Sequence, residues 1–305
     1  MRTRGLCFWH DTEAPKDGSD VKDRLEAWAD TGQSMEGFHL HHAALEGVKL
    51  SNRRSTDLRK VDFFRANLHG ASLYHTDLSQ AQLTKADLSG ANLNEAKMDD
   101  VDLLGAILDG ARLERVDWGD LAINEKRANA ALKNGQKEEA AARLEEAEEV
   151  YRALRRAYAA RSDGHNAEFF FRREMATRRR QMPRWSIGRL WSRLIDLVCA
   201  YGESPPRVIV SCMMFILLCG VAYFFLGVLG PEGYAQSDPG AGLRIIVEAL
   251  AECVDYSVVS FTSLGYSDEA RQSWLVRPIA GAQAFIGQFM MALFVVVFGK
   301  RMTRS

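Results

Sequence analysis

The most regular pattern along the chain has a period of five residues and runs from residue 56 to residue 120 without a break. Thirteen consecutive units share a small or β-branched residue at the first position and a bulky apolar residue at the third. The second position is mostly polar, and Ala fills the first position in eight units. Neither the alternation of a strand nor the 3.6-residue turn of a helix produces a period of five. A short fixed period therefore indicates units that stack into a solenoid.

This repeat resembles that of the pentapeptide-repeat family, and the units that carry the resemblance include Thr56-Asp-Leu58, Ala66-Asn-Leu68 and Ala86-Asp-Leu88. The resemblance implies a right-handed quadrilateral β-helix with four units per turn and with the central Leu or Phe and the preceding small residue pointing inward. Three further units, starting at Phe38, Ala43 and Val48, precede a register slip at residues 51–55. We therefore expect a β-solenoid over residues 38–120, about 20 Å long at a strand spacing of ~4.8 Å.

Two uncharged stretches, residues 208–229 and 278–299, change the picture from that of a soluble protein. Each has 22 residues without Asp, Glu, Lys or Arg. At ~1.5 Å per helical residue, such a helix is about 33 Å long and crosses a hydrocarbon core of roughly 30 Å. We predict two spans, over residues 207–230 and 276–300, in an all-α pore domain that occupies residues 207–305.

Basic residues flank both predicted spans and set their orientation. Seven arginines lie between residues 178 and 207, and Lys300, Arg301 and Arg304 follow the second span. Short basic flanks stay in the cytoplasm, and the residues before the first span contain no apolar run of signal-peptide length. We therefore expect a multi-pass protein of the plasma or inner membrane with both termini cytoplasmic.

Residues 184–206 place apolar side chains against arginines, in the pattern of an amphipathic helix on the inner membrane surface, in contact with lipid. The apolar members are Trp185, Leu190, Trp191 and Leu194. A nucleic-acid patch is the alternative interpretation of the arginines. The formal net charge of -1 argues against a strongly basic nucleic-acid binder, so we expect no nucleic-acid partner.

The segment between the spans resembles the pore loop of tetrameric potassium channels. The filter of that family reads Thr-Val-Gly-Tyr-Gly-Asp after a short pore helix, and we expect pore helix and filter over residues 244–268. Here Ser263 takes the Thr place, Leu264 the Val place and Ser267 the place of the second Gly, while Gly265, Tyr266 and Asp268 match. The expected filter is therefore Thr262, Ser263, Leu264, Gly265, Tyr266, Ser267 and Asp268.

The resemblance implies passive conduction of K⁺ through backbone carbonyl rings supplied by four copies of the chain. A permeant cation would bind at Ser263, Leu264, Gly265 and Tyr266, and no other cofactor is implied. Glycine tolerates the alternating backbone hand that this filter needs. Ser267 departs from the family pattern and leaves selectivity over Na⁺ open. The alternative function is a weakly selective or non-conducting scaffold tethered to the membrane.

Gly287 lies 22 residues after Gly265, near the position at which inner helices of the resembled channels bend to open. Gly287 is therefore a candidate gating hinge. An ordinary small residue for close helix packing is the other interpretation. No Arg-rich membrane segment precedes the first span, so we expect no voltage sensor of that kind.

Two further segments, residues 1–37 and 121–183, flank the repeat region. Residues 121–183 read as a helical hairpin, two helices around Ser162-Asp-Gly-His165, loosely similar to one tetratricopeptide-like unit. We interpret this linker as an assembly surface, with a ligand pocket as the alternative. Residues 1–37 form an N-terminal cap with a short helix at residues 20–30 that covers the open end of the solenoid.

Candidate chemistry outside the pore is sparse. Cys7 and His10 have half of the spacing of a metal site, which we interpret as a packing motif, with a metal completed by other chains left open. The five cysteines show no disulfide spacing, and we expect no metal at the scattered His39, His41, His42, His69 and His75. The chain contains no nucleophile elbow, phosphate loop or catalytic carboxylate pair, and we expect no enzymatic activity. Residues 56–120 carry twelve acidic and seven basic residues, a pattern that does not identify the cytoplasmic partner or ligand of the solenoid.

Overall fold

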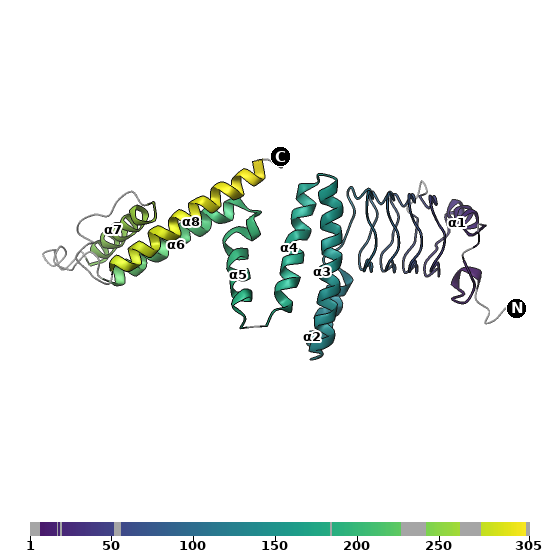
Figure 1. Cartoon of the computed structure of the whole chain (residues 1–305), viewed down its shortest axis with the longest axis horizontal. Coiled ribbons are helices and arrows are strands. Elements are labelled where there is room, and N and C mark those ends of the chain that lie inside the picture. The colour runs from purple at the N-terminus through teal and green to yellow at the C-terminus, as the bar shows by residue number, and fades with distance from the viewer. Residues whose placement is uncertain are drawn as a thin grey trace. The chain divides into compact units, whose positions relative to one another are not determined.

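The computed structural model describes residues 7–16, 18, 20–51, 56–183, 185–226, 242–262 and 276–302. The chain divides into two compact units, Met1–Arg189 and Leu190–Ser305. The first unit contains the N-terminal cap, the repeat region and helices α2 to α4, and the second contains the span-length helices (Figure 1). Each unit is described by itself.

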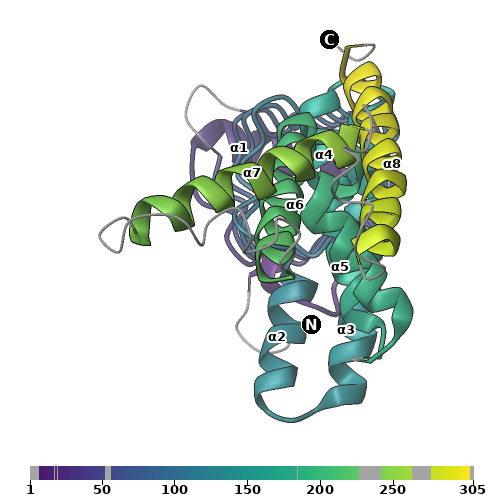
Figure 2. The ribbon, with the colours of Figure 1, turned by 90° about the vertical axis from the view of Figure 1, so that its left-hand side faces the viewer.

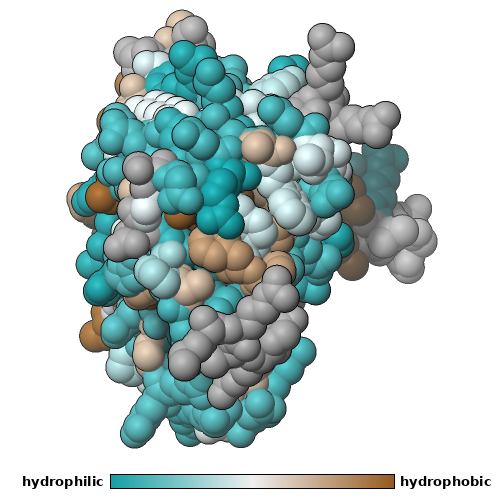
Figure 3. Space-filling model, turned by 90° about the vertical axis from the view of Figure 1, so that its right-hand side faces the viewer, coloured by the Kyte–Doolittle hydropathy of each residue, from teal (hydrophilic) through white to brown (hydrophobic). Residues whose placement is uncertain are grey.

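The first unit begins with the 3-10 turn η1 (Phe8–His10) and helix α1 (Asp20–Thr31). Val21, Leu25 and Ala29 of α1 are buried in the same apolar core as the repeat region. The ring of Trp9 stacks on Phe38 with 5.3 Å between centroids. The helix expected over residues 20–30 is therefore present and covers the apolar end of the repeats. The surface at this end of the first unit is mostly hydrophilic (Figure 3).

The repeat region winds into stacked turns of four units each. Parallel bridges join second positions 20 residues apart, as between Asp57 and Asp77. The bridge from His39 to Asp62 spans 23 residues, because the register slip at residues 51–55 adds three positions; residues 52–55 lie outside the described residues. These bridges are isolated, and no extended strand occurs in the described part of the repeat region. A β-helix built from strands therefore stays a prediction.

The interior of the coil is apolar, as its sequence pattern predicts. The third-position side chains from Leu58 to Leu113 are all at most 5% exposed. The first-position residues from Thr56 to Ala111 are also buried. At about 25 cal/mol per Å² of apolar surface removed from water, this continuous column is the main source of the coil's stability.

Polar second positions fix the corners of the coil. The carboxylate of Asp62 accepts a hydrogen bond from the backbone N–H of Phe64 at 2.9 Å, and Asp77 and Asp87 repeat this contact with the residue two positions on. In such an Asx turn, the side-chain oxygen takes the place of a backbone carbonyl as the hydrogen-bond acceptor. Every fifth position from residue 60 to residue 115 then has a positive φ, between 55° and 69°. The polar side chains at the second position therefore form turns.

Three helices follow the coil: α2 (Ile123–Lys133), α3 (Lys137–Ala160) and α4 (Gly164–Gln181). The expected break around Ser162 is present, and Asp163 caps α4 by accepting a hydrogen bond from Asn166 N. The prediction of two helices is wrong, because α2 ends at a further turn. Gly135 has φ +78° there, a left-handed conformation that terminates helices and that glycine adopts without steric cost.

Helix α3 packs over the last turn of the coil and between α2 and α4. Tyr158 Oη donates a hydrogen bond to Leu113 O at 3.0 Å and accepts one from Trp118 Nε1 at 2.8 Å. Tyr151 Oη donates to Glu125 at 2.7 Å and accepts from Ala122 N. The linker helices and the repeat coil therefore share one apolar core with hydrogen-bonded tyrosines at its edge.

Helix α5 (Ile187–Cys199) is followed by the turn η2 (Ala200–Gly202). Its large apolar side chains are exposed, among them Leu190, Trp191, Leu194 and Leu197. The segment therefore has the amphipathic character expected from its sequence, and its contact with lipid stays a prediction.

Candidate functional site

The second unit contains two helices that are long and apolar enough to cross a membrane. They are α6 (Pro205–Phe225) and the part of α8 (Val276–Met302) that starts at Pro278. Proline is favoured in the first helical turn, and α6 begins at Pro205, two residues before the predicted span. The helix ends at Phe225, while residues 227–230 lie outside the described residues.

Of the residues of the expected filter, the structure describes only the first, Thr262. Ser263, Leu264, Gly265, Tyr266, Ser267 and Asp268 lie outside the described residues, whereas Thr262 is the last residue of α7 (Gly242–Thr262). The hydroxyl of Thr262 donates to Val258 O at 2.9 Å within its own helix. The helix predicted from residue 244 onward therefore exists and ends where the expected filter begins.

Helix α7 crosses α6 and α8 instead of running along them (Figure 2). Phe261, at its C-terminal end, packs in one buried cluster with Ile216 and Met290. Both partners lie near the middle of their own helices. At the other end of α7, Arg244 and Glu248 are exposed and pair with each other at 2.9 Å. The C-terminal end of α7 therefore lies against the middle of α6 and α8, while its other end is exposed.

A buried hydrogen-bond network joins these three helices. Tyr223 Oη of α6 donates to Gln283 Oε1 of α8 at 2.6 Å. Gln283 Nε2 donates to the hydroxyl and the carbonyl oxygen of Ser257 of α7, at 2.7 and 3.0 Å. The Ser257 hydroxyl in turn donates to Ile216 O at 2.8 Å. The amide of Gln283 thus holds the C-terminal half of α7 against both other helices.

At Gly287, the backbone of α8 lies close to the end of α7. A Cβ at Gly287 would lie 2.2 Å from Phe261 O, closer than any real contact, whereas a Cβ at Gly281 would meet nothing within 4 Å. On the other side of α7, a Cβ at Gly220 of α6 would lie 2.8 Å from Val254 Cγ2. Both Gly220 and Gly287 therefore serve close helix packing, and the role of Gly287 as a gating hinge stays a prediction.

The opposite ends of α6 and α8 are joined by charge and by packing. Lys300, in the last turn of α8, forms an ion pair with Glu203, directly before α6. Val208 and Val297 are buried together with Cys199 beneath this pair. The two span-length helices are therefore antiparallel and connected at both ends.

Most of the surface of α6 and α8 is uncovered in one chain. Only 22% of the apolar stretch of each of these two helices is buried. The exposed side chains include Ile209, Met213, Leu217, Phe285, Phe289, Val295 and Val296. An exposed apolar surface of this size requires lipid, other subunits or both.

Sequence reasoning missed Tyr223, Ser257 and Gln283 as residues that position the site. A signal existed, since Gln283 is an amide within an uncharged stretch, and such polar residues in membrane helices face partner helices. Its partners could not be read from the sequence, because Ser257 and Tyr223 lie 26 and 60 residues away.

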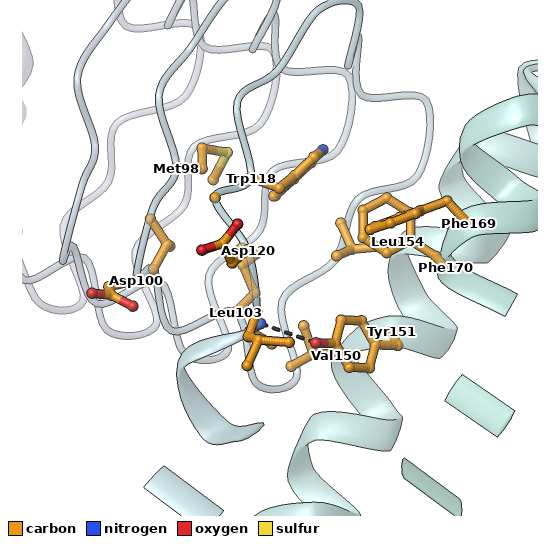
Figure 4. A pocket seen from close by; sticks show the side chains of 14 residues that line it. Met98, Asp100, Leu103, Trp118, Asp120, Val150, Tyr151, Leu154, Phe169 and Phe170 are labelled. Atoms are coloured by element: carbon orange, nitrogen blue, oxygen red, sulfur yellow. Dashed lines mark hydrogen bonds between the residues drawn. The ribbon is translucent and has the colours of Figure 1, made fainter. Parts of the chain in front are cut away.

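One cavity at the linker is too small for an organic ligand. That cavity lies between the end of the coil and α3 and α4, with Trp118, Tyr151 and Phe170 among its lining residues (Figure 4). Its volume is about 20 Å³, about enough for one water molecule. No group of three or more His, Cys, Asp or Glu side chains gathers in a metal-binding arrangement within the described residues.

Comparison with known proteins places the repeat region in a family. Residues 54–80 and 76–115 match the family of pentapeptide repeats, with 8 copies. The repeat region is therefore a pentapeptide-repeat domain. A search of curated proteins gives no significant match.

Solved structures of pentapeptide repeat proteins are similar to about a quarter to a third of this chain. HetL, described as involved in heterocyst differentiation regulation in the cyanobacterium Nostoc, is 35% identical over 26% of this chain and 38% of its own length, with a TM-score of 0.18. Rfr23 from the cyanobacterium Cyanothece is 29% identical over 28% of this chain and 56% of its own, with a TM-score of 0.20. A protein of the Arabidopsis thaliana thylakoid lumen is 24% identical over 35% and 79%, with a TM-score of 0.19. The chain thus spans less than two thirds of the length of the first two structures.

Proposed function

We propose that this protein is a homotetrameric, potassium-type cation channel whose cytoplasmic pentapeptide-repeat domain governs opening or binds a partner. Ions pass down their gradient through a filter formed by Thr262–Asp268 of four chains, without a cofactor or an enzymatic step. The channel lies in the plasma or inner membrane, with both termini in the cytoplasm.

The course of α7 supports this proposal most strongly. A helix that packs against two span-length helices and ends near the middle of both fits a pore helix better than a third span. Backbone inside a membrane is tolerated only where it is buried in protein or lines a water-filled path. The described part of this segment ends at Thr262, next to Phe261, which packs against Ile216 and Met290 near the middle of both helices.

The direction of α7 favours cations. The C-terminus of a helix carries about half a negative elementary charge, and α7 ends at Thr262 with its last residues buried between α6 and α8. Four such ends around an axis would stabilise a partly dehydrated cation. The network around Gln283 fixes the direction of each helix end.

Closed fourfold assembly follows from the single loop that each chain provides, because a carbonyl cage needs several loops around an axis. The uncovered apolar side chains of α6 and α8 supply the surface for neighbouring subunits and lipid. Native mass measurement in mild detergent should give tetramers. A purely monomeric or dimeric protein would contradict the proposal.

Purified protein in a planar lipid bilayer tests conduction directly. We expect cation currents that vanish in Gly265→Ala, because a Cβ resists the left-handed backbone that the filter needs, while tetramers persist. Tetramers without current in the unmodified protein would instead support a membrane-tethered repeat scaffold.

Ser267 provides a test of selectivity. A Cβ at the position of the second filter glycine strains the backbone by about 1 kcal/mol, which widens the outermost carbonyl ring and admits Na⁺. We expect Ser267→Gly to raise the permeability ratio of K⁺ to Na⁺, measured as reversal potentials in bi-ionic solutions. An unmodified channel that is already highly K⁺-selective and unchanged by Ser267→Gly would show that the serine is simply tolerated.

A further inference from the structure

The N-terminal cap contains a thiol and an imidazole that the proposed channel does not use. Cys7 is exposed and immediately precedes η1 (Phe8–His10). Residues three apart lie above one another in a 3-10 turn, and Cys7 Sγ is 3.0 Å from His10 Nδ1. The spacing that resembles half of a metal site therefore forms a direct contact between a nucleophile and a base.

The second ring nitrogen of His10 fixes which nitrogen faces the thiol. Nε2 lies 3.1 Å from the carbonyl oxygen of Glu36. A carbonyl oxygen can only accept, so Nε2 carries the proton and Nδ1 of the neutral ring presents its lone pair to Sγ. A nucleophile, a base within hydrogen-bond reach and a third group that orients the base form the arrangement that activates thiols.

Two basic side chains belong to the same cap as this pair. The guanidinium of Arg24 lies 4.1 Å from the centre of the Phe8 ring, and Lys16 interacts electrostatically with both Cys7 and His10. The ammonium of Lys16 donates to Asp11 O, which keeps it in the cap. The acidic side chains in the described part of this region include those of Asp11, Asp20, Glu36 and Asp62, of which Asp20 pairs with Arg24 and Glu36 with Lys60.

Protonation follows from these contacts. Partial burial acts to raise the pKa of Cys7, but the hydrogen bonds from His10 outweigh it, and the pKa of the thiol is lowered. The hydrogen bond with Cys7 raises the pKa of His10 against partial burial. Both directions favour a thiolate beside an imidazolium.

We propose that Cys7 is a modification site at which the thiol exchanges with a low-molecular-weight disulfide such as glutathione disulfide. His10 takes the thiol proton, and Cys7 Sγ attacks one sulfur of the disulfide. A new S–S bond to Cys7 forms while the old S–S bond breaks, and the proton on His10 passes to the leaving thiolate. One thiol and one disulfide give one mixed disulfide and one thiol. The proposal rests on the cap alone and does not depend on conduction.

The other four cysteines provide internal controls. Cys199 is buried and its thiol donates to Ile195 O. Cys212 and Cys219 are half-buried in α6, and Cys253 is buried in α7. Within the described residues, none of these four thiols forms a hydrogen bond with a histidine, and exchange should therefore be confined to Cys7.

The test measures the rate of alkylation by iodoacetamide against pH, on the full chain in detergent. The tryptic peptide of residues 5–16 contains Cys7 and no other cysteine, which allows its reaction to be followed by mass spectrometry. The unmodified protein should show a rate midpoint well below the ordinary thiol pKa of about 8.5. Glutathione disulfide at pH 7 should add one glutathione to this peptide, and a reductant should remove it.

Two variants distinguish activation of Cys7 by His10 from reactivity that is due only to exposure of the thiol. His10→Gln retains a donor toward Glu36 O but has no base, and should slow alkylation of Cys7 at pH 7 at least tenfold. His69→Gln, at an exposed histidine of the coil, should leave the rate unchanged. A rate midpoint near 8.5 in the unmodified protein, or glutathione spread evenly over the cysteines, would overturn the proposal even if His10→Gln disturbs the cap.

Discussion

Gly287 and Gly281 occupy the same apolar helix, yet their surroundings differ sharply. The Cα of Gly287 faces the carbonyl of Phe261, whereas Gly281 has open space where a side chain would begin. Small residues in membrane helices allow backbones to approach. The contact shows that Gly287 has a packing role before any role in bending.

We predict that Gly287→Ala displaces the C-terminal end of α7, because its Cβ would overlap Phe261 O at 2.2 Å. Overpacking of this kind costs about 1–3 kcal/mol. Tetramers of the variant should dissociate at a lower temperature in detergent, and currents should be lost. Gly281→Ala is the matched control and should leave a single chain's packing intact. Stable Gly287→Ala tetramers held shut would instead favour the hinge.

The corners of the coil also depend on single residues. Eight of the fifth positions from residue 60 to residue 115 carry a side chain despite their positive φ, among them Lys85 and Glu95. Each costs roughly 1–2 kcal/mol relative to a right-handed conformation. Buried Leu and Ala columns and the Asx turns hold these residues in place, so the strain is distributed along the coil.

Helix α7 is positioned by polar contacts rather than by its apolar surface alone. Ser257 and Gln283 are at most 1% exposed, and each satisfies the other's hydrogen-bonding groups. A buried polar group without a partner costs about 1–3 kcal/mol. The network therefore makes this orientation of α7 more stable than slightly rotated or shifted orientations.

Gln283→Leu should release α7, because it leaves Tyr223 Oη and the Ser257 hydroxyl with one partner fewer in a buried site. We expect a loss of about 1–3 kcal/mol, seen as earlier tetramer dissociation on heating and as reduced current. Met291→Leu, at an exposed side chain of the same helix, should have little effect. Equal behaviour of the two variants would show that the network does not position the pore helix.

The packing of α3 on the coil should become less stable at alkaline pH. Burial raises the pKa of Tyr158 to about 12, while the hydrogen bond from Trp118 acts in the opposite direction. The unfolded chain, with an ordinary tyrosine pKa of ~10, loses this proton first. Stability is therefore fully present below pH ~10 and falls toward pH 12, by up to about 1.4 kcal/mol per pH unit. Denaturant unfolding at several pH values measures this slope, which Tyr158→Phe should flatten.

The boundary between the two units lies at Arg189, well after the end of the repeats. Val150, Leu154 and Phe170 of the linker helices share their core with the coil. A truncation at the end of the repeats alone would expose these side chains to water. The linker therefore belongs with the repeat domain in the first unit.

Two truncations test this organisation. A chain that starts at Leu121 should aggregate or lose tetramers, since the apolar face of α3 loses its cover. A chain that starts at Pro183 removes the first unit up to the residues before α5, and should still insert and conduct, with an altered opening probability. Size-exclusion chromatography in detergent and bilayer recording compare the two. A Leu121 chain that behaves like the Pro183 chain would show that the linker folds without the coil.

Local pattern alone predicted the repeat coil and the two span-length helices. Period five repeats the same short-range turn, and an uncharged run of 22 residues has its length set by the rise of a helix, so neither requires knowledge of distant residues. The expected filter at Ser263–Asp268 rests on resemblance and lies outside the described residues. Gly135 carried a local signal for the extra turn after α2 that the two-helix interpretation overlooked.

Contacts between distant residues were settled only by the folded chain. The depth at which α7 ends depends on Phe261 meeting Met290, and the role of Gln283 depends on Tyr223, 60 residues away. Likewise, Cys7 and His10 are neighbours by spacing, but the carbonyl of Glu36 decides which nitrogen faces the thiol. Hydrogen bonds and close backbone approaches need orientation as well as composition, and orientation arises only when separate elements pack against one another.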